Sequence, residues 1–238
     1  MVFQNNLLMA AGGAAPDPIT LSQTHHAAAG GNATQSFSSC NIGTAAANRK
    51  VVVCAFSGYG APDNSGTPTI GGSNANWDGG GASHTTAQFV NCAIFSLDVA
   101  TGTSATITFP TRSTGGRYFG AIIVYAVYGA GAVHAAADNN EDTPPPMSAS
   151  IAIPAHGVLI GGAGYQYHTS SPTTTFTWTN ATKDFQGPMS SGFANNQCTG
   201  AHRIVTAAET PTVECQNSQT SSNNGRAWMQ LVSYVNDN

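Results

Sequence analysis

Two aspartates are the carboxylates best placed in the sequence for acid–base chemistry. Asp78 ends the stretch 74–78 and Asp184 ends the stretch 180–184, at nearly equivalent places in the two halves of the chain. Glycoside hydrolysis uses two facing carboxyl groups, so a polysaccharide depolymerase is one function that such a pair allows. Each aspartate, however, follows an Asn-containing stretch, where Asp commonly hydrogen-bonds its own backbone. We therefore expect turn residues here, and no enzyme.

Sugar binding is a second reading of the polar and aromatic residues. Aromatic faces with polar neighbours are typical of carbohydrate sites. The candidate glycan contacts are Asn76, Trp77, Asp78, Tyr165, Tyr167 and His168. The competing interpretation is that Trp77 anchors its loop onto the end of the fold.

Metal and nucleophile chemistry finds little support. The seven histidines form no HxH or HxxxH pair, the five cysteines form no CxxC pair, and there is no GxSxG motif. We expect neither a metal nor a cofactor. Cys54 lies in the apolar run 51–56, which indicates a buried thiol, and a disulfide between Cys198 and Cys215 is left open.

Two arginines occupy matching places, each after a glycine and just before an apolar run. Arg117 and Arg226 could form ion pairs with the carboxylates of a partner. The plainer interpretation, which we favour, is that each covers a turn or pairs with a nearby carboxylate such as Asp98.

The composition excludes several classes of function. Only 8% of the 238 residues are charged, against roughly 25% in an ordinary soluble domain. The net charge is −4 and the basic residues are scattered, which argues against nucleic acid as a partner. No segment approaches the ~20 apolar residues of a membrane span, and the N-terminus lacks a basic signal-peptide region. Low charge with many small polar residues is typical of secreted β-proteins and of virion proteins.

The elements that must position these residues are strands. β-branched and aromatic runs, separated by Gly, Asn, Ser, Thr and Pro, are found at Lys50–Phe56, Thr103–Phe109, Ala121–Tyr128, Val158–Ile160 and Met229–Val235. The run 103–109 alternates as a half-exposed strand should, whereas 121–128 is almost wholly apolar and predicts a central strand covered on both faces. The fold class is therefore all-β.

Similar segments that recur at a nearly constant offset predict that the chain is built from two pseudo-repeated halves. The matching segments, offset by about 107 to 109 residues, are 49–53 with 156–160, 101–107 with 209–215, 116–119 with 225–228, and 122–125 with 231–234. In each half the later segments indicate a hairpin that ends in a buried strand. We expect one antiparallel β-sandwich of jelly-roll type, with a first half at 19–137, a Pro-rich connector at 138–147 and a second half at 148–238.

Residues 1–18 differ from the rest and predict a docking segment with a spacer. Its apolar side chains, which we expect to contact a partner, are Val2, Phe3, Leu7, Leu8 and Met9. They could form a short helix ended by Gly12-Gly13. So short a helix is marginal alone in water, so it needs another surface to lie against.

The opening 1–12, MVFQNNLLMAAG, resembles the openings of many tail and accessory virion proteins of tailed bacteriophages. The phrases at 42–53, 69–72 and 100–107 are similar to the same group of phage β-sandwich proteins. The resemblance implies a structural subunit of the tail, neck or head, located in a virion assembled in the host cytoplasm. It implies other virion proteins and copies of the same chain, for example in a trimer, as partners. It carries no catalytic residues. A host-surface carbohydrate-binding module is the alternative, and a depolymerase ranks last.

Overall fold

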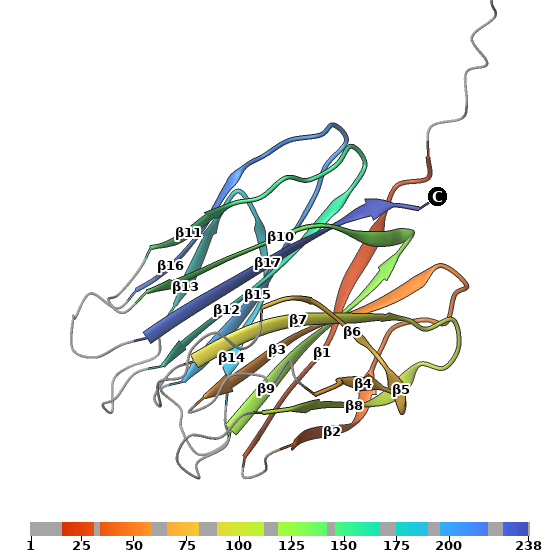
Figure 1. The fold of residues 1–238 in the computed structure, drawn as a ribbon, viewed down its shortest axis with the longest axis horizontal. Helices are drawn as coiled ribbons and strands as arrows, with labels where there is room; N and C mark the ends of the chain where they lie inside the picture. The colour runs from red at the N-terminus through yellow and green to blue at the C-terminus, as the bar shows by residue number, and fades with distance from the viewer. Residues whose placement is uncertain are drawn as a thin grey trace, which may run out of the picture.

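The computed structural model describes residues 16–30, 34–58, 66–80, 90–111, 119–141, 146–166, 175–189, 196–218 and 226–237. The regular elements in these residues are all strands, and every strand pair is antiparallel. The all-β fold class is therefore confirmed (Figure 1).

Two five-stranded sheets, which we call the inner sheets, form the middle of the molecule. The first has the order β1 (Thr20–Gly30), β9 (Phe119–Tyr128), β3 (Arg49–Gly58), β7 (Val90–Asp98) and β6 (Asn76–Gly79). The second has the order β10 (Ala130–Glu141), β17 (Arg226–Asn236), β12 (Val158–Gln166), β15 (Gln197–Ile204) and β14 (Thr182–Pro188).

Two smaller outer sheets complete a sandwich-like stack of four layers. The first outer sheet has the order β2 (Thr34–Asn41), β8 (Ser104–Pro110), β4 (Thr69–Ile70) and β5 (Ser73–Asn74). The second outer sheet has the order β11 (Met147–Ser150), β16 (Thr212–Asn217) and β13 (Phe176–Thr179).

Three hydrophobic cores hold the four layers together. Because successive side chains of a strand point to opposite faces, β3 sends Val51 and Val53 to the first outer sheet and Val52 and Cys54 to the second inner sheet. The central core joins β3, β7 and β9 to β12 and β17. A third core lies between the second inner and outer sheets and contains Trp178.

The five predicted runs all overlap strands, namely β3, β8, β9, β12 and β17. Residues 120–127 of β9 are buried throughout, which confirms a strand covered on both faces. β8 alternates in burial, as its alternating sequence predicted. The expected hairpin is wrong, because β8 pairs with β2 and β4 while β9 pairs with β1 and β3. Periodicity reports burial but not which strands are neighbours.

The boundary between the halves differs from the predicted one. β10, with its first residues inside the predicted first half, pairs with β17 in the second inner sheet. Residues 138–141 of the predicted connector form the end of this strand. The chain passes from one inner sheet to the other at Gly129, whose φ of +84° suits glycine.

The strands of the two inner sheets follow one another in the same spatial sequence. β1, β9, β3, β7 and β6 correspond in order to β10, β17, β12, β15 and β14. Duplication of one ancestral unit, and a jelly-roll relationship, stay predictions.

Candidate functional site

Both ends of the described chain meet at one end of the molecule, which we call the termini end. Asn236 donates its side-chain N–H to the carbonyl of Asp17 at 2.8 Å. The N–H of Gly129 donates to the Asn48 carbonyl at 3.0 Å, and the N–H of Asp237 donates to the Gly129 carbonyl at 2.9 Å. The chain therefore enters and leaves the described structure beside the turn that joins the halves.

The opposite end of the inner sheets is where most strands connect to segments outside the described residues. Gly58, the last residue of β3, pairs with Val90 at the start of β7 and with Phe119 at the start of β9. In the second inner sheet Gln166 pairs with Arg226 in the same way. The molecule thus has two distinct ends (Figure 1).

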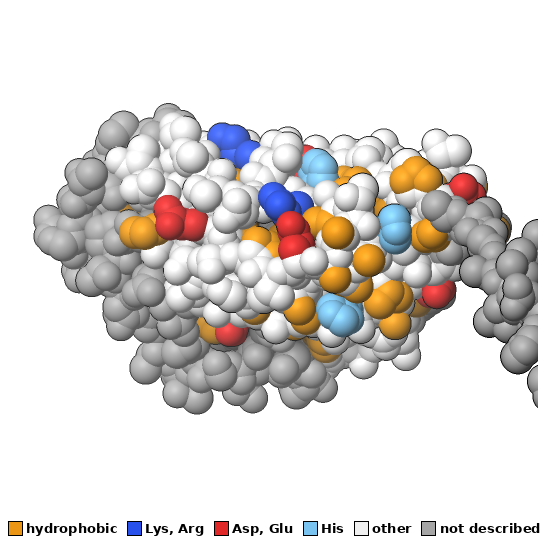
Figure 2. Space-filling view, turned by 90° about the horizontal axis from the view of Figure 1, so that it is seen from above, with side chains coloured by type: hydrophobic (Ala, Val, Ile, Leu, Met, Phe, Trp, Pro, Cys, Tyr) orange, Lys and Arg blue, Asp and Glu red, His pale blue; other side chains and the backbone are white. Residues whose placement is uncertain are grey.

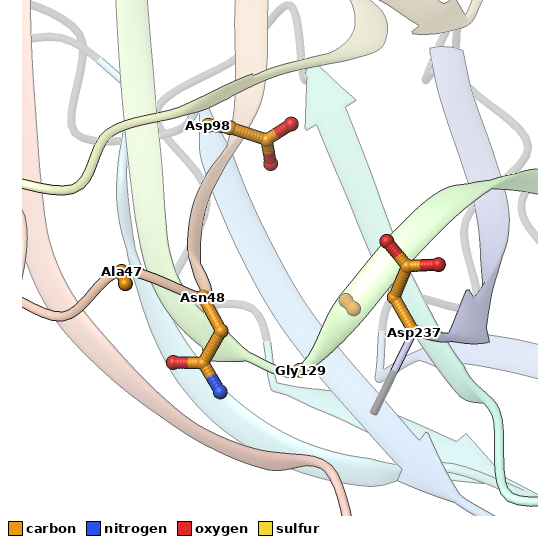
Figure 3. Close-up of a pocket in the computed structure, with 6 residues that line it drawn as sticks. Ala47, Asn48, Asp98, Gly129 and Asp237 are labelled. Carbon is orange, nitrogen blue, oxygen red and sulfur yellow. The ribbon is translucent and has the colours of Figure 1, made fainter.

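A hollow of about 320 Å³ lies at the termini end, lined by Ala47, Asn48, Asp98, Gly129, Ala130 and Asp237. Figure 3 shows the carboxyl groups of Asp98 and Asp237 and the carboxamide of Asn48 around it. The Nζ of Lys50 donates to Asp98 Oδ1 at 2.6 Å, so one of the two carboxylates is already paired. The hollow can offer oxygen acceptors to a polar partner.

A buried arginine holds the turns of this end in place. Arg49 is fully buried, and its guanidinium donates to the carbonyls of Val99 at 2.7 Å, Gly43 at 2.8 Å and Thr101 at 2.7 Å. In the sequence, Arg49 stood out only as one of the scattered basic residues and as the start of the repeated segment 49–53. The available signal was its position two residues before the apolar run 51–56 of β3.

The predicted docking residues Val2, Phe3, Leu7, Leu8 and Met9 lie outside the described residues. The same holds for Arg117 and for the side chain of Arg226. Their predicted roles stay predictions.

The three consecutive candidates on β6 do not form one sugar platform. Trp77 packs edge-on against Phe95, with ring centroids 5.3 Å apart, and its indole N–H donates to the Gly66 carbonyl at 2.9 Å. It belongs to the core under the first outer sheet. Asp78 receives a hydrogen bond from Tyr234 in the other half, and Asn76 is exposed. The contacts of Trp77 are those of an anchoring side chain, which favours the competing interpretation, although Trp77 lies in a strand rather than a loop. A glycan contact stays a prediction.

Tyr165 is a poor candidate for glycan contact, because its side chain is fully buried in the core under the second outer sheet. A sugar could reach its ring only if that core opened. Its position inside an apolar strand, Val158–Gln166, was the signal against it. Tyr167 and His168 lie outside the described residues.

Asp78 is not a turn residue but part of β6, at a bulge in its pairing with β7. Its Oδ2 accepts a hydrogen bond from the Tyr234 hydroxyl at 2.7 Å, and Ser96 supplies a second hydrogen bond. Burial raises the pKa of the Asp78 carboxyl, although these two hydrogen bonds and the charge of Lys50 oppose the shift.

Asp184 is likewise a strand residue, at a bulge in the pairing of β14 with β15. His202 Nδ1 lies 2.7 and 2.9 Å from its two carboxylate oxygens. Asp184 also lies near Tyr125 of the other half and adds to the rise that burial causes in the pKa of that phenol.

The two aspartates do not face each other. β6 and β14 are edge strands of different inner sheets, and β6 contacts β10 whereas β14 contacts β1. They thus lie at opposite edges of the stacked sheets, each held by its own partners. The carboxylate pair that a depolymerase needs is not assembled from them.

All five cysteines are buried and free. Cys198 faces the central core, whereas Cys215 lies in the core under the second outer sheet, so the disulfide left open between them does not form. Burial raises the pKa of the Cys54 thiol well above its usual range, as expected for an inert core thiol. Within the described ranges, no three His, Cys, Asp or Glu side chains are grouped closely enough to hold a metal ion.

The described part of the chain contains no helix that is long and apolar enough to span a membrane. Comparisons with protein-family models, with curated proteins and with solved structures found no match for this chain.

Proposed function

We propose that this chain is a structural subunit of a bacteriophage particle, in the tail, neck or head, with no catalytic turnover. Residues 1–18 dock on another virion protein and the β body projects from the particle. The observation that carries the proposal is that the molecule has two different ends, with both ends of the described chain at one of them. Asp17, near the end of the segment 1–18, accepts a hydrogen bond from Asn236 at the termini end. The attachment point and the opposite strand ends are therefore separated along the strands.

The surface supports assembly into a crowded particle. Figure 2 shows a face that is mostly white, the colour of uncharged polar side chains and backbone, with orange hydrophobic side chains gathered on one part of it and only a few blue and red groups. The whole chain has 7 Lys and Arg and 11 Asp and Glu residues. Neighbouring copies with so few charges repel one another weakly, which makes close packing inexpensive electrostatically.

The docking segment can supply enough binding free energy for this role. Burial of three or four of the side chains Phe3, Leu7, Leu8 and Met9 contributes on the order of 6–10 kcal/mol before the ordering costs are subtracted. Repeated copies on a symmetric particle add avidity. Other virion proteins and further copies of this chain are the partners that this arrangement requires.

Deletion of residues 1–13 tests the proposal. The truncated chain is expected to remain folded and soluble, because the described strands begin at Thr20, but to be missing from purified particles. A finer test changes one apolar side chain at a time. Leu7→Asp and Leu8→Asp are each expected to lower incorporation at least about tenfold, since burying a charge in an apolar groove is costly. Gln4→Ala is the matched control and should incorporate normally. Normal occupancy of the truncated chain would disprove docking through this segment.

Binding of host-surface glycan is a second candidate function, carried by the residues that directly follow Gln166. Tyr167 and His168 follow β12 at the strand end away from the termini end, where a particle-bound subunit would face the host. A glycan array tests it: Tyr167→Ala should erase a positive signal, whereas an unchanged signal, or none with the native chain, rejects this site.

A further inference from the structure

The strand β10 (Ala130–Glu141) is paired along one side only. It stands at the edge of the second inner sheet, where β17 is its neighbour. Within the described ranges no strand pairs with its other side. With 12 residues, β10 is the longest strand of the described structure. The backbone N–H and C=O groups along such an edge can pair with a further strand.

The strands above and below β10 leave this edge accessible. β6 of the first inner sheet contacts both β10 and β17, and β11 of the second outer sheet also contacts both. Each therefore lies over the space between these two strands rather than beyond the edge. Among the described elements, none blocks a second strand that approaches β10 in the plane of its sheet.

The side chains along the edge are small or exposed. Ala135, Ala136 and Ala137 form its centre, and the pairing with β17 is regular from Ala135 onward. Lysine or proline commonly protects an edge strand from association, and β10 contains neither. Val133 on the same strand is 40% exposed, one of two large hydrophobic side chains that are exposed in the described part of the chain. A further strand would cover these residues.

The order of residues on β10 suits antiparallel pairing with a second copy of itself. With a two-fold axis at Ala136, Ala135 faces Ala137 of the other copy, and His134 faces Asp138 of the other copy. The symmetry makes each of these pairs occur twice. Both His134 and Asp138 are exposed, and neither has an ion pair within the described residues. An imidazole N–H can donate to a carboxylate, and opposite charges that face each other across two strands are stabilising.

Other arrangements lack this match. With the axis at Ala137, Asp138 faces Ala136, and with the axis at Asp138 the carboxylate faces itself, which is destabilising. β1, the corresponding edge strand of the first inner sheet, contains no Asp or Glu, so it offers no carboxylate to its histidines in any register with itself. The charges therefore favour β10 and one register.

We propose that two copies of this chain pair antiparallel through β10, with the two-fold axis at Ala136, so that their second inner sheets become one continuous sheet. A contact of this kind is closed after two copies, so it yields a dimer and neither a trimer nor a filament. One strand from each copy buries less area than a standard interface, so we expect a dissociation constant on the order of 1–100 μM. The pairing goes beyond the proposed function, since the isolated chain forms it without a particle.

Sedimentation velocity of the full chain over a range of concentrations tests the proposal. The native chain is expected to show a monomer–dimer equilibrium. His134→Asp should weaken it about five- to tenfold, because two facing pairs change from attraction to repulsion. The double variant with His134→Asp and Asp138→His exchanges the two groups and should restore native affinity. Thr206→Asp, at an exposed position outside β10, is the control and should dimerise like the native chain.

Three results of this experiment would overturn the proposal: a native chain that stays monomeric at millimolar concentration, one that forms trimers or larger oligomers, or a double variant as weak as His134→Asp. None of them bears on whether residues 1–13 attach the chain to a particle.

Cross-linking tests the register separately. All five native cysteines are buried, so Ala136→Cys introduces an accessible thiol that lies opposite its own copy. A short bis-maleimide should convert this variant to a covalent dimer on a denaturing gel, whereas Ala207→Cys, at an exposed position outside β10, should stay monomeric. Equal yields from the two variants would contradict pairing through β10.

Discussion

The two edge strands β6 and β14 use one backbone feature with different chemistry. Each has a bulge at an aspartate, and each aspartate lies beside a tyrosine from the opposite half, Asp78 with Tyr234 and Asp184 with Tyr125. The third partner differs, since Ser96 faces the first carboxylate and His202 the second. The bulge and the neighbouring tyrosine are thus common to both halves, whereas the further partner of each carboxylate differs.

The largest effect on the free energy of unfolding is expected from the arginines that stabilise turns, because the two halves bind their arginines differently. In the first half Arg49 is buried against three carbonyls, whereas Arg203 in the second half is a third exposed and pairs with Glu209. Arg49→Met should lower the free energy of unfolding by about 3–5 kcal/mol, because the carbonyls lose their donors. Arg203→Met should cost under about 1 kcal/mol. Urea unfolding of both variants measures the two losses in free energy of unfolding. Equal losses would contradict the expected difference between the arginines.

Trp77 gives the next largest effect. Trp77→Ala should lower the free energy of unfolding by about 2–4 kcal/mol, since it empties a place beside Phe95 and removes the bond to Gly66. The matched change in the second half is Trp178→Ala, which removes an indole that donates to Thr199 at 3.1 Å. Thermal unfolding should show both variants less stable. If Trp77→Ala kept native stability yet lost a glycan signal, Trp77 would be a ligand contact after all.

Variants of the two tyrosines test how strongly each carboxylate depends on its neighbouring hydroxyl. Tyr234→Phe deletes the 2.7 Å hydrogen bond to Asp78 and should cost about 1.5–3 kcal/mol, because the partly buried carboxylate loses a donor. Tyr125→Phe should cost less, since His202 continues to hold Asp184. Chemical denaturation of the two single variants decides the order, and a larger loss in Tyr125→Phe would reverse the account.

The smallest expected effect is a pH dependence from Asp78. Burial raises its folded-state pKa above the usual value of 3.8. The folded chain therefore binds this proton more tightly than the unfolded chain, so the stability it contributes is fully present below the unfolded pKa and is lost as pH rises through the folded one. Relative to Asp78→Asn, the native chain should become more stable as pH falls from 7 toward 4. A flat difference between the two unfolding curves would contradict the raised pKa.

Local sequence patterns were sufficient for the most apolar strands, because burial leaves its period in the residues themselves. The apolar run 121–128 predicted the buried β9, and Val51–Phe56 predicted a buried Cys54 in β3. Pairing was not predictable in the same way. β8 and β9 are close in sequence but belong to different layers, and an apolar strand carries no mark of its neighbours.

The candidate site was predicted less well, for a physical reason. Asp78 and Asp184 have turn-like neighbours in sequence, so the local preference favoured a turn. The structure instead places each in a strand bulge, near a tyrosine that is distant in sequence. Such a partner leaves no local signal. Trp77 and Tyr165 showed the same limit, because an aromatic residue with polar neighbours has similar local sequence in a core and in a sugar site.

Electron microscopy of assembled particles tests the central claim most directly. The account predicts density for residues 1–13 lying against a different polypeptide, with the termini end nearest to the particle and the opposite strand ends farthest from it. If those residues instead lay along the sheets of their own subunit, or if the chain were absent from the particle, a role as an attached subunit would be excluded.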